Sequence, residues 1–161
     1  MDVLRPFPSF YFRVALEGAA EGPDGGFQDA SGLDAVRETE VVAEGGENRF
    51  FHRLPGRVRH RNLALKRGLL PAASPLRQWC VKAIQSDLGN KVEPRGIDVS
   101  LLDPDGNPVA TWSLRRAWPM RLQIGAFDAY LNAPAIETLE FAFAGIQRRD
   151  GSSQPVMLGF G

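Results

Sequence analysis

Residues 97–115 read IDVSLLDPDGNPVATWSLR, and this stretch predicts a β-hairpin. Apolar and polar residues alternate on both sides of the segment DPDGN, as expected for two strands with one buried face each. Aspartate, proline, glycine and asparagine between two alternating runs are typical of a tight turn between antiparallel strands. The clearest local pattern in the chain therefore indicates a β fold.

Alternation elsewhere in the chain predicts further strands on both sides of this hairpin. They cover residues 10–17, 27–30, 36–43, 63–66, 118–124 and 135–143. The run 36–43 carries charge on both faces, so we expect it to be partly unpaired or to pair with another chain. After the turn at 44–48, apolar residues resume at Phe50, and Pro55-Gly56 is expected to break the chain again.

A single helix is predicted after Ser74-Pro75, because serine caps helices and proline favours the first helical position. An apolar stripe continues to Leu88 at spacings of three and four, and Gly89 provides a stop. Together these elements predict a mainly β fold, a small β-barrel or sandwich of about eight strands with one amphipathic α-helix. We expect residues 1–149 to form one domain and residues 150–161 a mobile tail with little to bury.

Charge is segregated along a chain whose net charge is zero. Residues 17–47 contain nine acids and one base, a net charge of −8, whereas residues 48–86 contain nine bases and no acid. The two stretches could pair within one chain as neighbouring strands. They could equally pair between copies, since two different complementary patches fit only head to tail and generate rings or helical stacks.

Candidate catalytic and metal-binding residues are few. His52 and His60 lie in an arginine-rich stretch, where positive charge opposes metal binding. Cys80 lies on the apolar stripe of the helix and is expected to be buried, and Glu137 and Glu140 on a strand are expected to make ordinary ion pairs. We therefore expect no enzyme, no metal and no cofactor.

The basic stretch leaves a nucleic-acid-binding role open as an alternative. Phe50 and Phe51 could stack on bases while the arginines of residues 49–61 meet phosphates. The acidic stretch before it would compete for the same arginines, so specific binding is not our first expectation.

There is also no apolar run of about 18 residues and no signal-peptide pattern, so we expect synthesis in the cytoplasm and no membrane partner.

Several motifs in one order resemble the tail-tube protein family of contractile phages and extracellular contractile injection systems. They are SGLD at 31–34, EGGENRF at 44–50, HRLPGR at 52–57, NLALKRG at 62–68, AWP at 117–119, FDA at 127–129 and IETLE at 136–140. The resemblance covers about residues 8–146. The loop at 17–26 and the tail after Arg149 are longer than is usual in that family.

The resemblance implies a β-barrel with one helix, assembled into hexameric rings that stack head to tail as the inner tube of a phage tail or injection particle. It implies sheath, spike or baseplate proteins and tube paralogues as partners, and a loop at 44–56 that reaches an adjacent ring. The ring–ring contact would include Glu44, Glu47, Asn48, Arg49, Arg53 and Arg57. Tube body and baseplate-proximal tube initiator both remain open, since residues 48–50 and Trp79-Cys80 look closer to the initiator variant.

Overall fold

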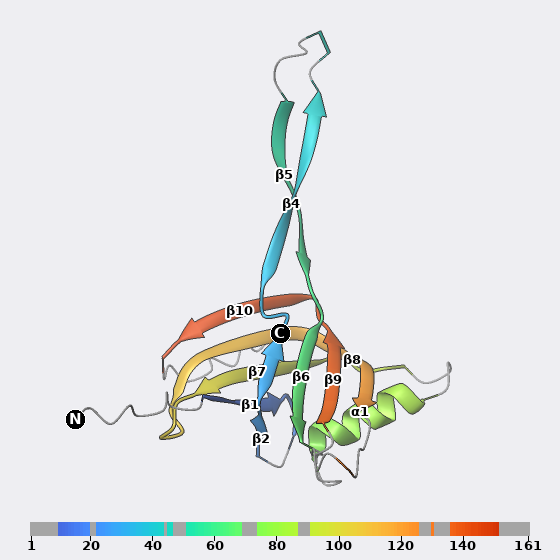
Figure 1. The fold of residues 1–161 in the computed structure, drawn as a ribbon. Helices are drawn as coiled ribbons and strands as arrows, with labels where there is room; N and C mark the ends of the chain where they lie inside the picture. Colours follow the sequence, from blue (N-terminus) through green and yellow to red (C-terminus); the bar gives the residue numbers. More distant parts are fainter. Residues whose placement is uncertain are drawn as a thin grey trace, which may run out of the picture.

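The computed structural model describes residues 10–19, 22–43, 45–46, 51–68, 74–86, 91–125, 130 and 136–151. These residues contain ten strands and one helix (Figure 1). In chain order they are β1 (Tyr11–Leu16), β2 (Asp24–Phe27), β3 (Asp29–Ser31), β4 (Ala35–Ala43), β5 (Phe51–His60), β6 (Leu63–Gly68), α1 (Pro75–Gln85), β7 (Arg95–Leu102), β8 (Pro108–Ile124), β9 (Ile136–Ala142) and β10 (Gly145–Asp150). The predicted mainly β fold with one helix is confirmed.

Eight of the strands form an antiparallel sheet in the order β2-β1-β7-β8-β9-β6-β3, with β10 also paired to β8. The two ends of this path, β2 and β3, are consecutive in the chain and separated only by Gln28, whose N–H donates to the Lys66 carbonyl. The sheet therefore closes on itself around a core that includes Phe27, Val99, Leu139 and Phe141. The prediction of one strand at 27–30 was wrong. At Gln28 the chain passes from one half of the barrel, where β2 pairs with β1, to the other half, where β3 pairs with β6.

Strand β8 belongs to both halves of the barrel. Its first part pairs with β7 and β10, and its second part pairs with β9. Arg116 lies between the two parts with φ at 52°, a left-handed conformation that bends the strand without ending it. A separate strand at 118–124 was therefore a wrong prediction, and β10 was missed.

The helix α1 begins as predicted. Ser74 accepts a hydrogen bond from the Arg77 N–H at 3.2 Å, and Pro75 occupies the first turn. Leu76, Trp79 and Cys80 are buried against the barrel. The helix ends at Gln85, about one turn earlier than predicted, and Leu88 and Gly89 lie outside the described residues.

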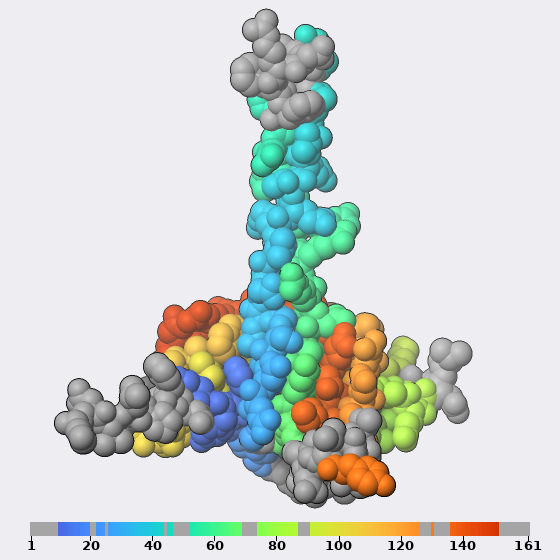
Figure 2. All heavy atoms as spheres, in the orientation of Figure 1, coloured from blue at the N-terminus to red at the C-terminus, as the bar shows by residue number. Residues whose placement is uncertain are grey.

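Strands β4 and β5 form a separate two-stranded sheet that projects from the barrel as a long hairpin (Figures 1 and 2). Pro55 and Gly56 do not end β5, contrary to the prediction, because the register shifts there and the strand continues through a bulge to His60.

The domain boundary at 149 stays a prediction: β10 includes Asp150, and residues 152–161 lie outside the described part of the chain.

Candidate assembly interface

The β4–β5 hairpin leaves the barrel between β3 and β6, which pair with each other. Its two legs meet closely at the base: a Cβ added at Gly32 would overlap the Asn62 carbonyl oxygen, and Gly32 has φ at +87°. Only glycine fits this position without strain. Asn62 in turn donates a hydrogen bond to Glu140 of β9 at 2.8 Å. The base of the hairpin is thus fixed to the barrel wall.

Beyond its base, the hairpin exposes large apolar side chains to solvent. Its exposed apolar residues are Val36, Val41, Val42, Leu54 and Val58. Val41 is 60% exposed, although valine in a strand is normally half-covered. A two-stranded hairpin is marginally stable in water without further packing, and its outer edges offer unpaired N–H and C=O groups. The hairpin therefore gains little packing from its own barrel beyond the base.

Opposite charges pair within this chain near the hairpin base. Arg59 lies 2.7 Å from Glu38, and Arg61 lies 3.8 Å from Asp34. The acidic and basic stretches therefore pair partly inside one copy, as the intrachain alternative predicts. Further from the base the pairing stops: within the described residues, no ion pair is found for Arg53 or Glu40.

The sequence-predicted contact residues fall in and around the hairpin. Arg53 and Arg57 lie on β5, Arg53 directly opposite Val41 and Arg57 at the bulge. Both side chains are exposed. Glu44, Glu47, Asn48 and Arg49 lie outside the described residues. Sequence reasoning missed the exposed valines. The strand at 36–43, expected to be partly unpaired or to pair with another chain, instead pairs with β5 of the same chain, and its charge on both faces reflects a hairpin that projects from the barrel.

A second exposed surface runs along the later part of β8. Residues 118–124 pair with β9 on one side, and among the described strands none pairs with the other side. Trp118 and Met120 are exposed on this part. An open strand edge that carries large exposed apolar side chains is a common site of pairing between chains.

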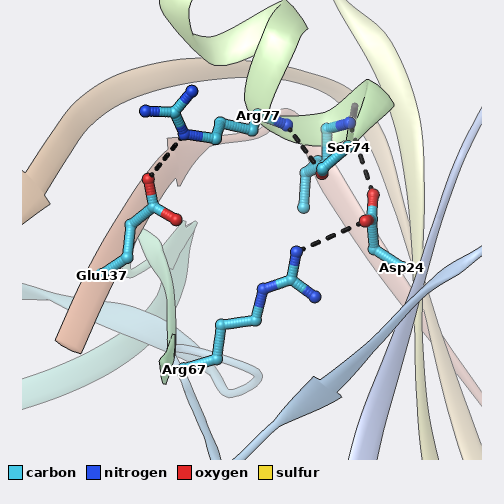
Figure 3. Close-up of polar contacts among 6 residues, drawn as sticks. Asp24, Arg67, Ser74, Arg77 and Glu137 are labelled. Carbon is cyan, nitrogen blue, oxygen red and sulfur yellow. Dashed lines mark hydrogen bonds and ion pairs between the residues drawn. The ribbon is translucent and has the colours of Figure 1, made fainter. Parts of the chain in front are cut away.

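A network of charges lies beneath the start of α1 (Figure 3). Arg77 lies 3.2 Å from Glu137, whose side chain is fully buried, and Arg67 lies 3.4 Å from Asp24. The second Asp24 oxygen accepts from the Leu76 N–H at 3.4 Å. The predicted ion pairing of Glu137 is thus confirmed, and that of Glu140 with Arg121 at 3.7 Å as well. The network joins α1 to β2, β6 and β9.

The same surroundings make Cys80 unreactive. Burial raises the pKa of the Cys80 thiol to about 12, and the nearby carboxylates of Glu137 and Asp24 add to the shift. Burial also lowers the pKa of the Arg67 guanidinium, while Asp24 and then Glu137 act in the opposite direction. A thiol with a raised pKa is a poor nucleophile, so the predicted buried, structural Cys80 is confirmed.

The described residues were also compared with the patterns of a metal site and of a membrane-spanning helix. His60 packs against Phe143 in a tilted arrangement, with ring centroids 5.1 Å apart and planes at 39°, at the foot of the hairpin. In the part of the chain that the structure covers, no three histidine, cysteine or carboxylate side chains come together as a metal site. Among the described residues there is also no helix long and apolar enough to cross a membrane.

Comparison with known families identifies the chain. The model of the T4-like virus tail tube protein gp19 family matches residues 8–147. The chain belongs to this tail tube family. The predicted family is confirmed, and with it the role of a structural tail-tube protein; nothing in the comparisons supports the nucleic-acid alternative. Among curated proteins, no sequence match is found.

Solved structures of similar fold come from contractile injection systems. A chain of the anti-feeding prophage baseplate has 29% identity and a TM-score of 0.72, with 93% of this tail tube protein and 98% of that chain covered. A chain of the PVC sheath-tube complex in the extended state has 27% identity and a TM-score of 0.70, with coverage of 92% and 94%. Hcp1 from Salmonella typhimurium, at 10% identity, a TM-score of 0.55 and coverage of 88% and 87%, shows the fold alone.

Proposed function

We propose that copies of this chain form rings of six that stack head to tail into the inner tube of a contractile phage-tail-like particle. The tube is a rigid conduit inside a sheath, and its subunits are made in the cytoplasm before assembly with sheath and baseplate proteins. Support comes from the tail tube family and from the similar chains of sheath-tube and baseplate assemblies. This role needs no catalytic residue.

The β4–β5 hairpin is the proposed contact between successive rings. The observation that carries this assignment is the exposure of apolar residues along an isolated two-stranded sheet that extends from the barrel (Figure 2). Burial of such residues contributes roughly 25 cal/mol for each Å² of apolar surface covered. A partner that covers the hairpin would therefore stabilise both the hairpin and the stack.

The proposed ring–ring contact residues belong to β5 or to the sequence between β4 and β5. They are Glu44, Glu47, Asn48, Arg49, Arg53 and Arg57. Their charges set the register of one ring on the next more than they add affinity, since exposed ion pairs contribute little free energy but strongly affect partner choice. Contacts within a ring are assigned to the open edge of β8 at 118–124, with Trp118 as the largest exposed side chain there.

The proposal includes both the tube body and the layer at the baseplate. Similar structures come from the baseplate, from the sheath-tube complex and from the tube-terminating cap of such particles. Their identities to this chain, 29%, 27% and 25%, are too close together to favour one layer.

The test compares the full chain with a variant whose hairpin is shortened. Arg37 and Val58 are direct partners, so an Asn-Gly turn that joins them replaces residues 38–57. The strand pairs Val36–Arg59 and Ala35–His60 at the base are kept, and the exposed ion pair of Glu38 with Arg59 is lost. By negative-stain microscopy, the full chain is expected to give rings and tubes and the variant single rings. A full chain that stays monomeric at high concentration contradicts the tube proposal. Tubes formed by the shortened variant contradict the role of the hairpin.

A further inference from the structure

The two-stranded sheet of β4 and β5 has two outer edges. Among the described strands, β4 pairs only with β5, so each of the two strands has one edge that no other strand covers. An uncovered edge that carries exposed apolar side chains is a template on which further strands add, as in the growth of amyloid sheets. Val41, Val42 and Leu54 are exposed on these strands. A free subunit therefore carries a risk of open-ended sheet growth.

The outer edge of β5 is interrupted near the middle of the strand, at Pro55 and Gly56. Proline has no N–H, and within a sheet it is tolerated where the missing donor would face away from the partner strand. The pairing also shifts here, because Gly56 and Arg57 together lie opposite Glu38. Such a bulge bends the strand, so the outer N–H and C=O groups on its two sides do not form one continuous row.

Contacts within the hairpin hold this interruption in place. A Cβ added at Gly56 would lie 2.9 Å from the Glu38 carbonyl oxygen, so the two backbones approach each other more closely than a side chain at position 56 allows. The Arg37 guanidinium donates a hydrogen bond to the Gly56 carbonyl at 3.3 Å. At two consecutive positions of β5, one donor is therefore missing and one acceptor is already in use.

The outer edge of β4 has no such interruption, since the strand from Ala35 to Ala43 contains neither proline nor glycine. Two hairpins that met through their β4 edges would form a pair with only β5 edges on its outside. Growth beyond that pair needs the second edge of each hairpin. An interruption of one edge is therefore enough to prevent open-ended growth.

We infer that Pro55, Gly56 and Arg37 form a device that keeps unassembled subunits from joining edge to edge into open-ended sheets. The exposed side chains of Arg53 and Arg57 act in the same direction, because two β5 edges that approached each other would bring like charges together. The device acts on free subunits before any assembly, so it does not rest on the proposed tube.

The experiment restores a continuous β5 edge. Pro55→Thr supplies the missing donor. A combined variant, Pro55→Thr with deletion of Gly56, also removes the bulge and would place Arg57 directly opposite Glu38. Pro104→Thr, at an exposed position between β7 and β8, is the matched control outside the hairpin. The full-length chains, at equal concentration, are followed by centrifugation, thioflavin T fluorescence and electron microscopy.

The combined variant is expected to lose most of its protein from the supernatant as solid fibrils with a strand spacing of about 4.7 Å. Pro55→Thr alone is expected to lose less, and the unmodified chain and Pro104→Thr should give no such fibrils. Microscopy distinguishes solid fibrils from hollow tubes, so a failure of the proposed tube would not affect this result. Absence of fibrils from both hairpin variants, amorphous aggregates in their place, or equal fibrils from Pro104→Thr would overturn the inference.

A second measurement uses the unmodified chain as an inhibitor. Added to growing fibrils of the combined variant, it is expected to pair through β4 and to leave its interrupted β5 edge at the fibril end. Elongation should therefore stop at substoichiometric amounts of the unmodified chain, whereas the shortened-hairpin chain should have no effect. Continued elongation in the presence of the unmodified chain would contradict a blocked β5 edge.

Discussion

The buried pair Arg77–Glu137 gives the sharpest test of how α1 is held on the barrel. Glu137→Gln keeps the size of the side chain and an oxygen that accepts from Arg77, but it removes the charge. The Glu137 side chain is fully buried and that of Arg77 is 29% exposed, so solvent screens the pair weakly. We expect a loss of about 2 kcal/mol in the free energy of unfolding, within the range of hydrogen bonds to charged groups.

The matched control is Asp150→Asn, which removes the charge from an exposed pair. Arg148 and Asp150 lie 2.7 Å apart, but their side chains are 60% and 73% exposed. Exposed ion pairs contribute roughly 0 to 1 kcal/mol, so this substitution is expected to have little effect.

Urea unfolding and thermal unfolding of both variants are measured on the shortened-hairpin chain, because assembly would otherwise stabilise the folded state by mass action. Thermal midpoints are expected to fall by roughly 4 to 8 °C for Glu137→Gln, using about 2 to 4 °C for each kcal/mol in a domain of this size. Equal losses for the two variants would refute the reasoning, since burial is the feature that separates the two pairs.

Three further predictions concern other positions. Cys80, with a pKa raised from 9.0 to about 12, should resist alkylation at pH 8 until urea unfolds the chain. Because the folded state holds the thiol proton more tightly than the unfolded state, the contribution of Cys80 to stability is complete below pH 9 and should be lost as pH rises toward 12. Alkaline unfolding of the unmodified chain and of Cys80→Ala checks this pH dependence. Gly32→Ala should lower the free energy of unfolding by about 2 kcal/mol or more, because of its positive φ and the contact with Asn62. Gly68→Ala, which has open space around it, should lower it by less. Urea unfolding measures both values. Arg49→Glu with Arg53→Glu should abolish stacking in electron micrographs and leave circular dichroism unchanged, and normal tubes from this double variant would count against both residues as contacts.

Alternation and turn chemistry predicted much of the barrel from sequence. The stretch 97–115 forms β7, its turn and the first part of β8, and Ser74-Pro75 begins α1. Failures occurred where tertiary pairing overrides local signals. Strand β10 was missed because Ile146 is its one large apolar residue, and its pairing with β8 supplies what its own pattern lacks.

The candidate interface was only partly predictable. Motif resemblance placed the contact at 44–57, and the structure adds a hairpin that includes residues from Ala35 onward. The charged stretches were compatible with pairing inside or between copies, because composition does not give register. The side chains of Glu38 and Arg59 form an ion pair within the hairpin. The register places Arg53 opposite Val41, where no carboxylate faces it directly.

The way the hairpin joins the barrel has a mechanical consequence. Its two legs continue into β3 and β6, and β6 is paired with β9 from Leu63–Phe141 to Gly68–Ile136. Hydrogen bonds between antiparallel strands run perpendicular to the strands, so tension along the hairpin shears this ladder and loads its bonds together instead of peeling them one after another. A subunit pushed or pulled through its hairpin transmits the force into the barrel as one rigid piece.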